Sequence, residues 1–122
     1  MTAIVVMAKA PIPGTVKTRL IDRLGADGAA TLHGELLEQA LTTAAEAAHR
    51  AAATLYLACA PAPEDPLWNS FRGRAALISQ GDGDLGQRMQ HVFSALLARH
   101  ERVVMIGADC PQLTPNELTT AL

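Results

Sequence analysis

Three cationic side chains lie in one short stretch near the start of the chain: Lys9, Lys17 and Arg19. Two prolines and Gly14 lie between them, which is typical of a stiff loop whose glycine lets the backbone approach a ligand. The stretch follows an apolar run and leads into a helical pattern, so free N–H groups at the helix start would face a bound anion. We predict a phosphate-binding loop. The alternative is an ordinary turn with solvated charges.

One carboxylate holds a comparable position late in the sequence. Asp109 comes shortly after the apolar run 103–106. A carboxylate opposite a bound pyrophosphate would repel it unless a divalent cation lay between them, so we predict that Asp109 is a ligand of Mg²⁺ or Mn²⁺. The alternative is an aspartate that caps the turn before Pro111.

A glycine-rich segment, Gly81-Asp-Gly-Asp-Leu-Gly86, matches the dinucleotide pattern G-x-G-x-x-G letter for letter. Two observations argue against that reading: Asp82 and Asp84 would repel pyrophosphate at the helix start, and the segment follows the third apolar run instead of the first. Asp84 is either the N-cap of the next helix or part of a turn that contacts a base or ribose, with Arg88 close by.

Four short apolar runs, 3–7, 53–58, 75–78 and 103–106, alternate with segments of helical spacing. Their nearly continuous apolar character predicts parallel strands covered on both faces. Helices are expected at 27–50 and 84–100, with a shorter one at 61–72 and another beginning at Thr114. In the second of these, the expected apolar face comprises Leu85, Met89, Val92, Phe93, Leu96 and Leu97.

These elements predict an α/β fold of the Rossmann-like three-layer α/β/α type, with a mostly parallel sheet of strand order 3-2-1-4. In that order the first and fourth strands are neighbours, and ligands bind at their carboxyl ends. The basic loop and Asp109 follow those two ends.

Composition narrows the class of protein. At 122 residues the chain has the length of one domain, and residues 1–122 are expected to form a single nucleotide-binding domain. A net charge of −2 argues against a nucleic-acid or membrane-surface protein, and no apolar run reaches the length of a membrane span. Two isolated cysteines indicate neither a disulfide framework nor a zinc cluster, which favours a cytoplasmic location. The four histidines lack metal-ligand spacing and are expected to be surface or satisfied residues.

Three motifs together resemble one bacterial family. They are Lys9-Ala-Pro-x-Pro-Gly-x-Val-Lys-Thr-Arg-Leu20, Gln80-Gly-Asp-Gly-Asp-Leu-Gly-Gln-Arg-Met89 and Ile106-Gly-Ala-Asp-Cys-Pro-Gln-Leu113. The sequence is similar to the glycosyltransferase-A-like family associated with arsenosugar biosynthesis, much of it a domain of unknown function, within the nucleotide-diphospho-sugar transferase superfamily. The resemblance implies that Asp109 binds the cation and that Lys17, Arg19 and Asp109 serve catalysis. It implies a nucleotide-binding set of Lys9, Pro11, Gly14, Lys17, Thr18, Arg19, Gly83, Asp84, Gly86 and Arg88.

The resemblance covers the donor half of a glycosyltransferase-A fold, and the chain is expected to be truncated at its C-terminus. We therefore expect a metal-dependent transferase that binds a nucleoside-diphosphate sugar. Two alternatives stay open, a nucleotidyltransferase that uses a nucleoside triphosphate and a non-catalytic nucleotide-binding module that pairs with a partner or a second copy through a sheet edge. A dinucleotide-dependent oxidoreductase is disfavoured by the acidic residues of the glycine-rich segment.

Overall fold

A computed structural model describes residues 2–9, 21–60 and 62–107. The predicted helix at Thr114 and the basic loop beyond Lys9 lie outside these ranges. In chain order the elements are β1 (Thr2–Lys9), α1 (Ile21–Ala51), β2 (Thr54–Ala60), η2 (Pro66–Phe71), β3 (Ala76–Ser79), α2 (Leu85–Leu97) and β4 (Arg102–Gly107).

The four strands form one parallel sheet in the order β3-β2-β1-β4, which confirms the predicted order. β1 lies between β2 and β4, so Met7 pairs with Gly107 while Ala8 pairs with Cys59. The carboxyl ends of β1 and β4 therefore lie side by side.

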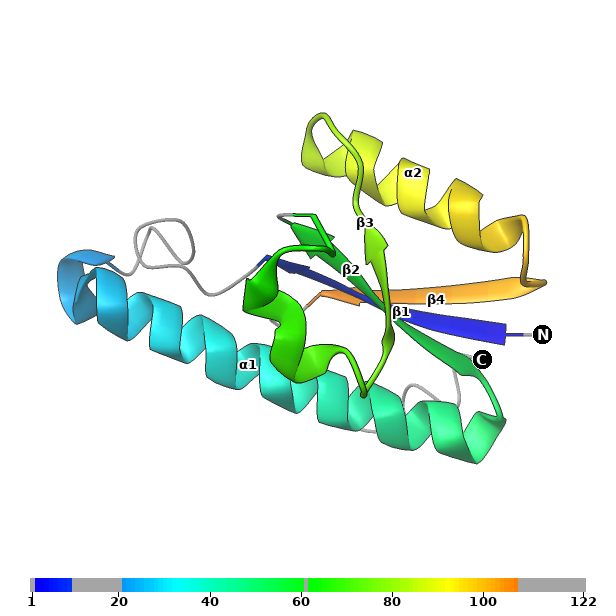
Figure 1. The fold of residues 1–122 in the computed structure, drawn as a ribbon, viewed down its shortest axis with the longest axis horizontal. Coiled ribbons are helices and arrows are strands. Elements are labelled where there is room, and N and C mark those ends of the chain that lie inside the picture. Colours follow the sequence, from blue (N-terminus) through cyan, green and yellow to red (C-terminus); the bar gives the residue numbers. More distant parts are fainter. Residues whose placement is uncertain (1, 10–20, 61, 108–122) are drawn as a thin grey trace.

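Helices cover both faces of the sheet, giving the predicted three layers (Figure 1). Ala3, Ile4, Val5 and Val6 of β1 are fully buried, as expected for a strand with apolar neighbours on both sides. Because successive side chains alternate, Ile4 and Val6 pack with α1 and η2, while Ala3 and Val5 pack with Val92 and Leu96 of α2.

The first helix is longer than the predicted 27–50 and is broken near its start. Gly25 has φ 74° and ψ 166°, which is not helical, so two helical pieces meet there. Glycine reaches this positive φ without the penalty that a Cβ would bring. Beyond the break, the helix buries a stripe of small and aliphatic side chains against the sheet: Leu37, Ala40, Leu41, Ala44, Ala47 and Ala48.

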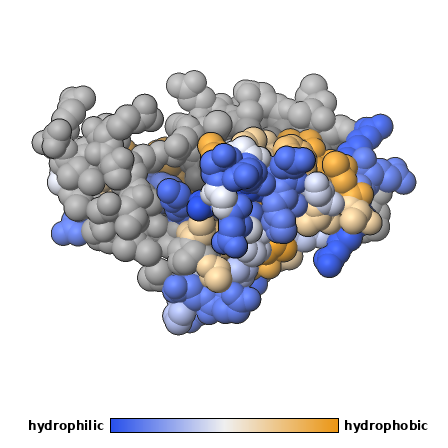
Figure 2. All heavy atoms as spheres, turned by 90° about the horizontal axis from the view of Figure 1, so that it is seen from above, coloured by the Kyte–Doolittle hydropathy of each residue, from blue (hydrophilic) through white to orange (hydrophobic). Residues whose placement is uncertain are grey.

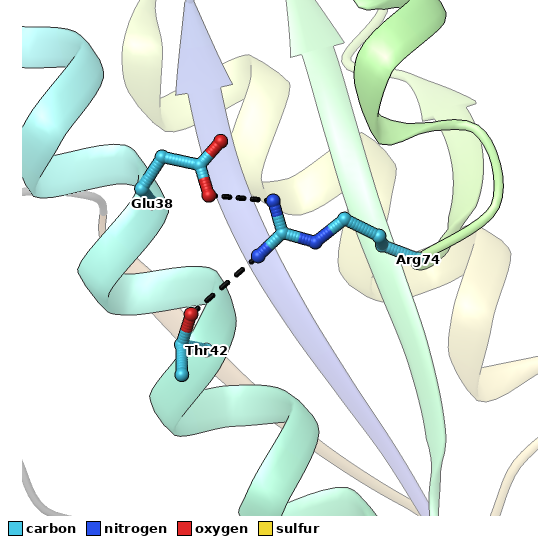
Figure 3. Close-up of polar contacts among 3 residues, drawn as sticks. All are labelled: Glu38, Thr42 and Arg74. Atoms are coloured by element: carbon cyan, nitrogen blue, oxygen red, sulfur yellow. Dashed lines mark hydrogen bonds and ion pairs between the residues drawn. The ribbon is translucent and has the colours of Figure 1, made fainter.

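The predicted helix at 61–72 is a 3-10 helix, η2, that carries the fully buried Trp68. After it, Arg74 donates to Glu38 Oε2 at 2.5 Å and to Thr42 Oγ1 at 3.5 Å, and so ties the start of β3 to α1 (Figure 3). Both charged side chains are more than one-third exposed. This ion pair therefore contributes little, on the order of 0.5 kcal/mol.

The predicted helix at 84–100 is α2, and its expected apolar face is only partly correct. Val92 and Leu96 are buried, but Leu85, Met89 and Leu97 are exposed. The physical reason is that α2 packs on the sheet through Val92 and Leu96, and the side chains that flank this buried pair face outward. Among the described residues that are visible from the α2 side, hydrophobic patches lie next to hydrophilic ones (Figure 2). Within the described ranges, no helix is long and apolar enough to cross a bilayer.

Candidate functional site

A pocket of about 460 Å³ lies at the carboxyl edge of the sheet. Its walls come from the end of β1, the last residue of β4, the turn after β3 and the first turns of α2, with one side chain from α1. Its size falls within the usual range for small-molecule sites. The lining residues are Met7, Ala8, Lys9, His33, Gln80, Gly83, Asp84, Leu85, Arg88 and Gly107.

The pocket brings together four of the predicted site residues from two distant parts of the sequence: Lys9, Gly83, Asp84 and Arg88. Gly86 is exposed on α2 and does not line it. The remaining predicted residues lie outside the described ranges: Pro11, Gly14, Lys17, Thr18, Arg19 and Asp109. Their roles stay predictions.

Arg88 is half-buried on α2, and its Nε atom is buried without a hydrogen-bond partner in the described part of the chain. A guanidinium keeps its charge at any ordinary pH and cannot avoid the cost by losing a proton. Strand alternation places Lys9 on the same face as Met7, which packs with the α2 cluster. Two cations therefore border one pocket, and an anion is the ligand that would satisfy them.

The turn after β3 has the geometry of a helix start. Asp84 is the N-cap of α2: its Oδ1 accepts from Gln87 N at 2.8 Å, while Gln87 Oε1 accepts from Asp84 N at 2.9 Å. This reciprocal capping box confirms the N-cap prediction. Gly81 and Gly83 have positive φ values of 81° and 107°, and a Cβ on Gly81 would meet the His91 ring at 2.9 Å. The glycines here serve the turn.

Two pocket residues escaped the sequence analysis as site residues. Gln80 is 4% exposed, and its Nε2 donates to Ala8 O and Ala58 O, both at 3.0 Å. His33 is 8% exposed and bonds through Nε2 to Lys9 O at 2.8 Å. Both side chains hold backbone carbonyls, and a carbonyl leaves no signature in the sequence. A polar residue among the apolar positions of a helix, as His33 is, was the available signal.

Comparison with known proteins shows which family the sequence belongs to. Residues 42–122 match the model of a family described as "uncharacterized protein conserved in bacteria (DUF2064)". The chain belongs to this family.

The same fold recurs in a crystal structure of a protein from Desulfovibrio desulfuricans G20, described as a "putative nucleotide-diphospho-sugar transferase". The TM-score is 0.82 and the sequence identity is 30%, over 99% of this DUF2064 chain. The alignment covers 52% of the other protein, so the present chain spans about half its length. No curated protein gives a match to the chain.

The described residues do not build a metal cage by themselves. Across residues 2–9, 21–60 and 62–107 there is no group of three or more histidine, cysteine, aspartate or glutamate side chains that could hold a metal ion. Asp84 is the carboxylate that lines the pocket in these ranges, and its Oδ1 is engaged as the helix cap. A cation in this DUF2064 site would therefore depend on a ligand's own oxygens and on residues outside these ranges.

Cys59 is buried and is not among the residues that line the pocket. The thiol is 2% exposed, and burial raises its pKa to about 12, an effect that the nearby Arg72 charge only partly offsets. A thiol that stays protonated is a poor nucleophile and a poor metal ligand. Cys59 is a packing residue.

Proposed function

We propose that this chain is the donor-binding half of a metal-dependent transferase that binds a nucleoside-diphosphate sugar in the pocket at the carboxyl edge. The observation that carries the proposal is the convergence of Lys9 and Arg88 on one pocket, with Arg88 Nε buried and unpartnered there among the described residues. The structural likeness to the nucleotide-diphospho-sugar transferase supports the choice of ligand.

A diphosphate fits this environment because it brings several oxygens that can accept from both cations at once. The sheet order favours the same location, since β1 and β4 end side by side and ligands of doubly wound sheets bind where such neighbouring connections diverge. Lys17 and Arg19 are proposed to stabilise the charge that develops on the diphosphate leaving group. Gly83, Asp84 and Gly86 would lie toward the nucleoside.

The cation is proposed to be Mg²⁺ or Mn²⁺, bound by phosphate oxygens together with Asp109. This arrangement agrees with the lack of a preformed cage in the described residues, because Mg²⁺ commonly takes one or two carboxylates and completes its shell with phosphate and water. When bound, the cation would neutralise charge on the diphosphate.

Ligand-dependent stabilisation tests the proposal directly. The protein is heated with panels of nucleoside-diphosphate sugars and nucleoside triphosphates, each with Mg²⁺, with Mn²⁺ and with EDTA. A ligand at 100 times its Kd should stabilise the folded state by about 2.7 kcal/mol and raise Tm by several degrees. If neither class changes Tm with either cation, the proposal is wrong.

A product assay then separates the two transfer reactions. Release of nucleoside diphosphate from a sugar nucleotide indicates glycosyl transfer, whereas release of pyrophosphate from a triphosphate indicates nucleotidyl transfer. Asp109→Asn should abolish the difference between Mg²⁺ and EDTA. Cation-dependent binding that is unaffected by this change would instead favour a module without metal-assisted catalysis. The arsenosugar association stays a prediction about the substrate.

A further inference from the structure

The last two carbonyl groups of β1 are each held by a side chain from another element. Ala8 O accepts from Gln80, which follows β3, and Lys9 O bonds to His33 Nε2 of α1 at 2.8 Å. Lys9 is also the first cation of the predicted phosphate-binding loop. The strand end is thus tethered just where the basic stretch begins.

The His33 contact has a defined donor. A carbonyl oxygen can only accept, so Nε2 must carry the proton. The neutral Nε2–H tautomer and the imidazolium both meet this requirement, whereas the Nδ1–H tautomer does not. The tether therefore persists when His33 gains a proton and is lost when its donor is removed.

From this geometry we infer that His33 is a positioning residue that holds the carboxyl end of β1, and with it Lys9, at the wall of the pocket. The Lys9 carbonyl belongs to a planar peptide group, so fixing its oxygen fixes the ψ angle of Lys9. With ψ fixed, the end of β1 is held at the pocket before any ligand arrives, and binding then costs less ordering free energy. This inference rests on the proposed function, because it assigns His33 to the same pocket.

The burial of His33 supports a specific role for its side chain. His33 is 8% exposed and lines the pocket, whereas His49 on the same helix is exposed. A leucine at 33 would match the apolar stripe of α1 and would fill similar space. The imidazole differs from leucine chiefly in the donor that it presents to Lys9 O.

Three substitutions separate donor loss from loss of packing. The amide nitrogen of glutamine can take the position of His Nε2, so His33→Gln should keep the bond. Asparagine is too short to reach, and His33→Leu keeps volume without a donor. Inorganic pyrophosphate with Mg²⁺, titrated by calorimetry, is the probe, and His49→Leu is the matched control on the same helix. His33→Leu and His33→Asn should weaken pyrophosphate binding about five- to tenfold, and His33→Gln by less than about twofold.

The ligand-free protein provides a second readout. Imidazole ¹⁵N chemical shifts should show the proton of neutral His33 on Nε2, and a proton on Nδ1 instead would overturn the inference. If the wild type binds pyrophosphate and all three variants bind equally well, the positioning role is wrong while the proposed function stands. If the wild type binds neither pyrophosphate nor any nucleotide of the panel, the inference and the proposed function both fail. Should His33→Leu not fold, the contrast between Gln and Asn decides.

Discussion

Two buried nitrogen atoms lack a hydrogen-bond partner within the described ranges, and they lie at opposite edges of the sheet. Arg88 Nε is at the carboxyl edge beside the pocket. His100 Nδ1 is at the amino edge, where His100 precedes β4 and its Nε2 bonds to Tyr56 Oη at 2.7 Å. Both residues have a buried nitrogen without a hydrogen-bond partner, but they differ in how the cost of burying that nitrogen can be avoided.

The imidazole of His100 can stay neutral and present an unprotonated nitrogen at Nδ1, so its missing partner costs no buried charge. Its ring packs edge-on against Tyr56, with centroids 5.5 Å apart. The guanidinium of Arg88 has no neutral form, and a cavity adjoins it. An unpartnered nitrogen therefore indicates a ligand only where the group cannot neutralise itself and where space is available.

The largest effect is expected for Arg88→Met, which tests the anion role of the carboxyl edge. Loss of the guanidinium removes a charge-assisted bond to the proposed diphosphate, so the Kd of a nucleoside-diphosphate sugar should rise about 10- to 100-fold. Calorimetry measures it. Arg99→Met is the control, because Arg99 is exposed after α2 and does not line the pocket. Equal Kd values for the two variants would contradict an anion role for Arg88.

Gln80→Leu tests whether the carboxyl edge also carries stability. The change removes a donor shared by two carbonyls, Ala8 O and Ala58 O, and should lower the free energy of unfolding by about 2 kcal/mol. Urea unfolding followed by circular dichroism gives the value. Gln90→Leu, at an exposed position of α2, should leave it nearly unchanged.

Tyr56→Phe tests the hydrogen bond at the amino edge of the sheet. It deletes one hydrogen bond to His100 and keeps the ring, so the free energy of unfolding should fall by about 1 kcal/mol. Because the pair lies away from the pocket, the Kd for a nucleotide should not change. A weaker affinity in this variant would show that the two edges are coupled.

The smallest effect is expected at Cys59. In a Cys110→Ser background, the remaining thiol should not react with a disulfide reagent at pH 8, because burial raises its pKa to about 12 from 9.0. Because the pKa of the thiol is higher in the folded state than in the unfolded state, its contribution to stability is fully present below pH 9. That contribution is lost as the pH rises from about 9 toward 12. Cys59→Ala should remove that pH dependence. Rapid modification of the native protein would contradict the assignment.

The order of the sheet was predictable because each strand is an apolar run between helical segments, and right-handed crossovers leave few arrangements. The cap at Asp84 was equally accessible, since an aspartate with glutamine three residues on is a local signal. The exposure of Leu85 and Leu97 was not, because an apolar side chain does not reveal how wide a surface its helix covers. Apolar periodicity predicts which side of a helix faces the sheet, but not how many of the apolar side chains on that side are buried.

Part of the site was predictable for a related reason. Lys9 was predicted from the basic stretch and Arg88 from the glycine-rich turn and the family resemblance, and the structure brings them to one pocket. The contacts of Gln80 and His33 could not be foreseen, since each is made with a backbone carbonyl that any residue would supply. The other proposed residues of the basic stretch, together with Asp109, remain predictions.

Burial of Trp68 has a practical consequence. It is the single tryptophan of the chain, it lies on η2 fully buried in the cluster that α1 forms with the sheet, and it is not among the residues that line the pocket. Its fluorescence emission therefore reports the integrity of the α1 layer, undisturbed by direct contact with a nucleotide. Intrinsic emission and ligand titration can thus be recorded on the same sample as independent signals.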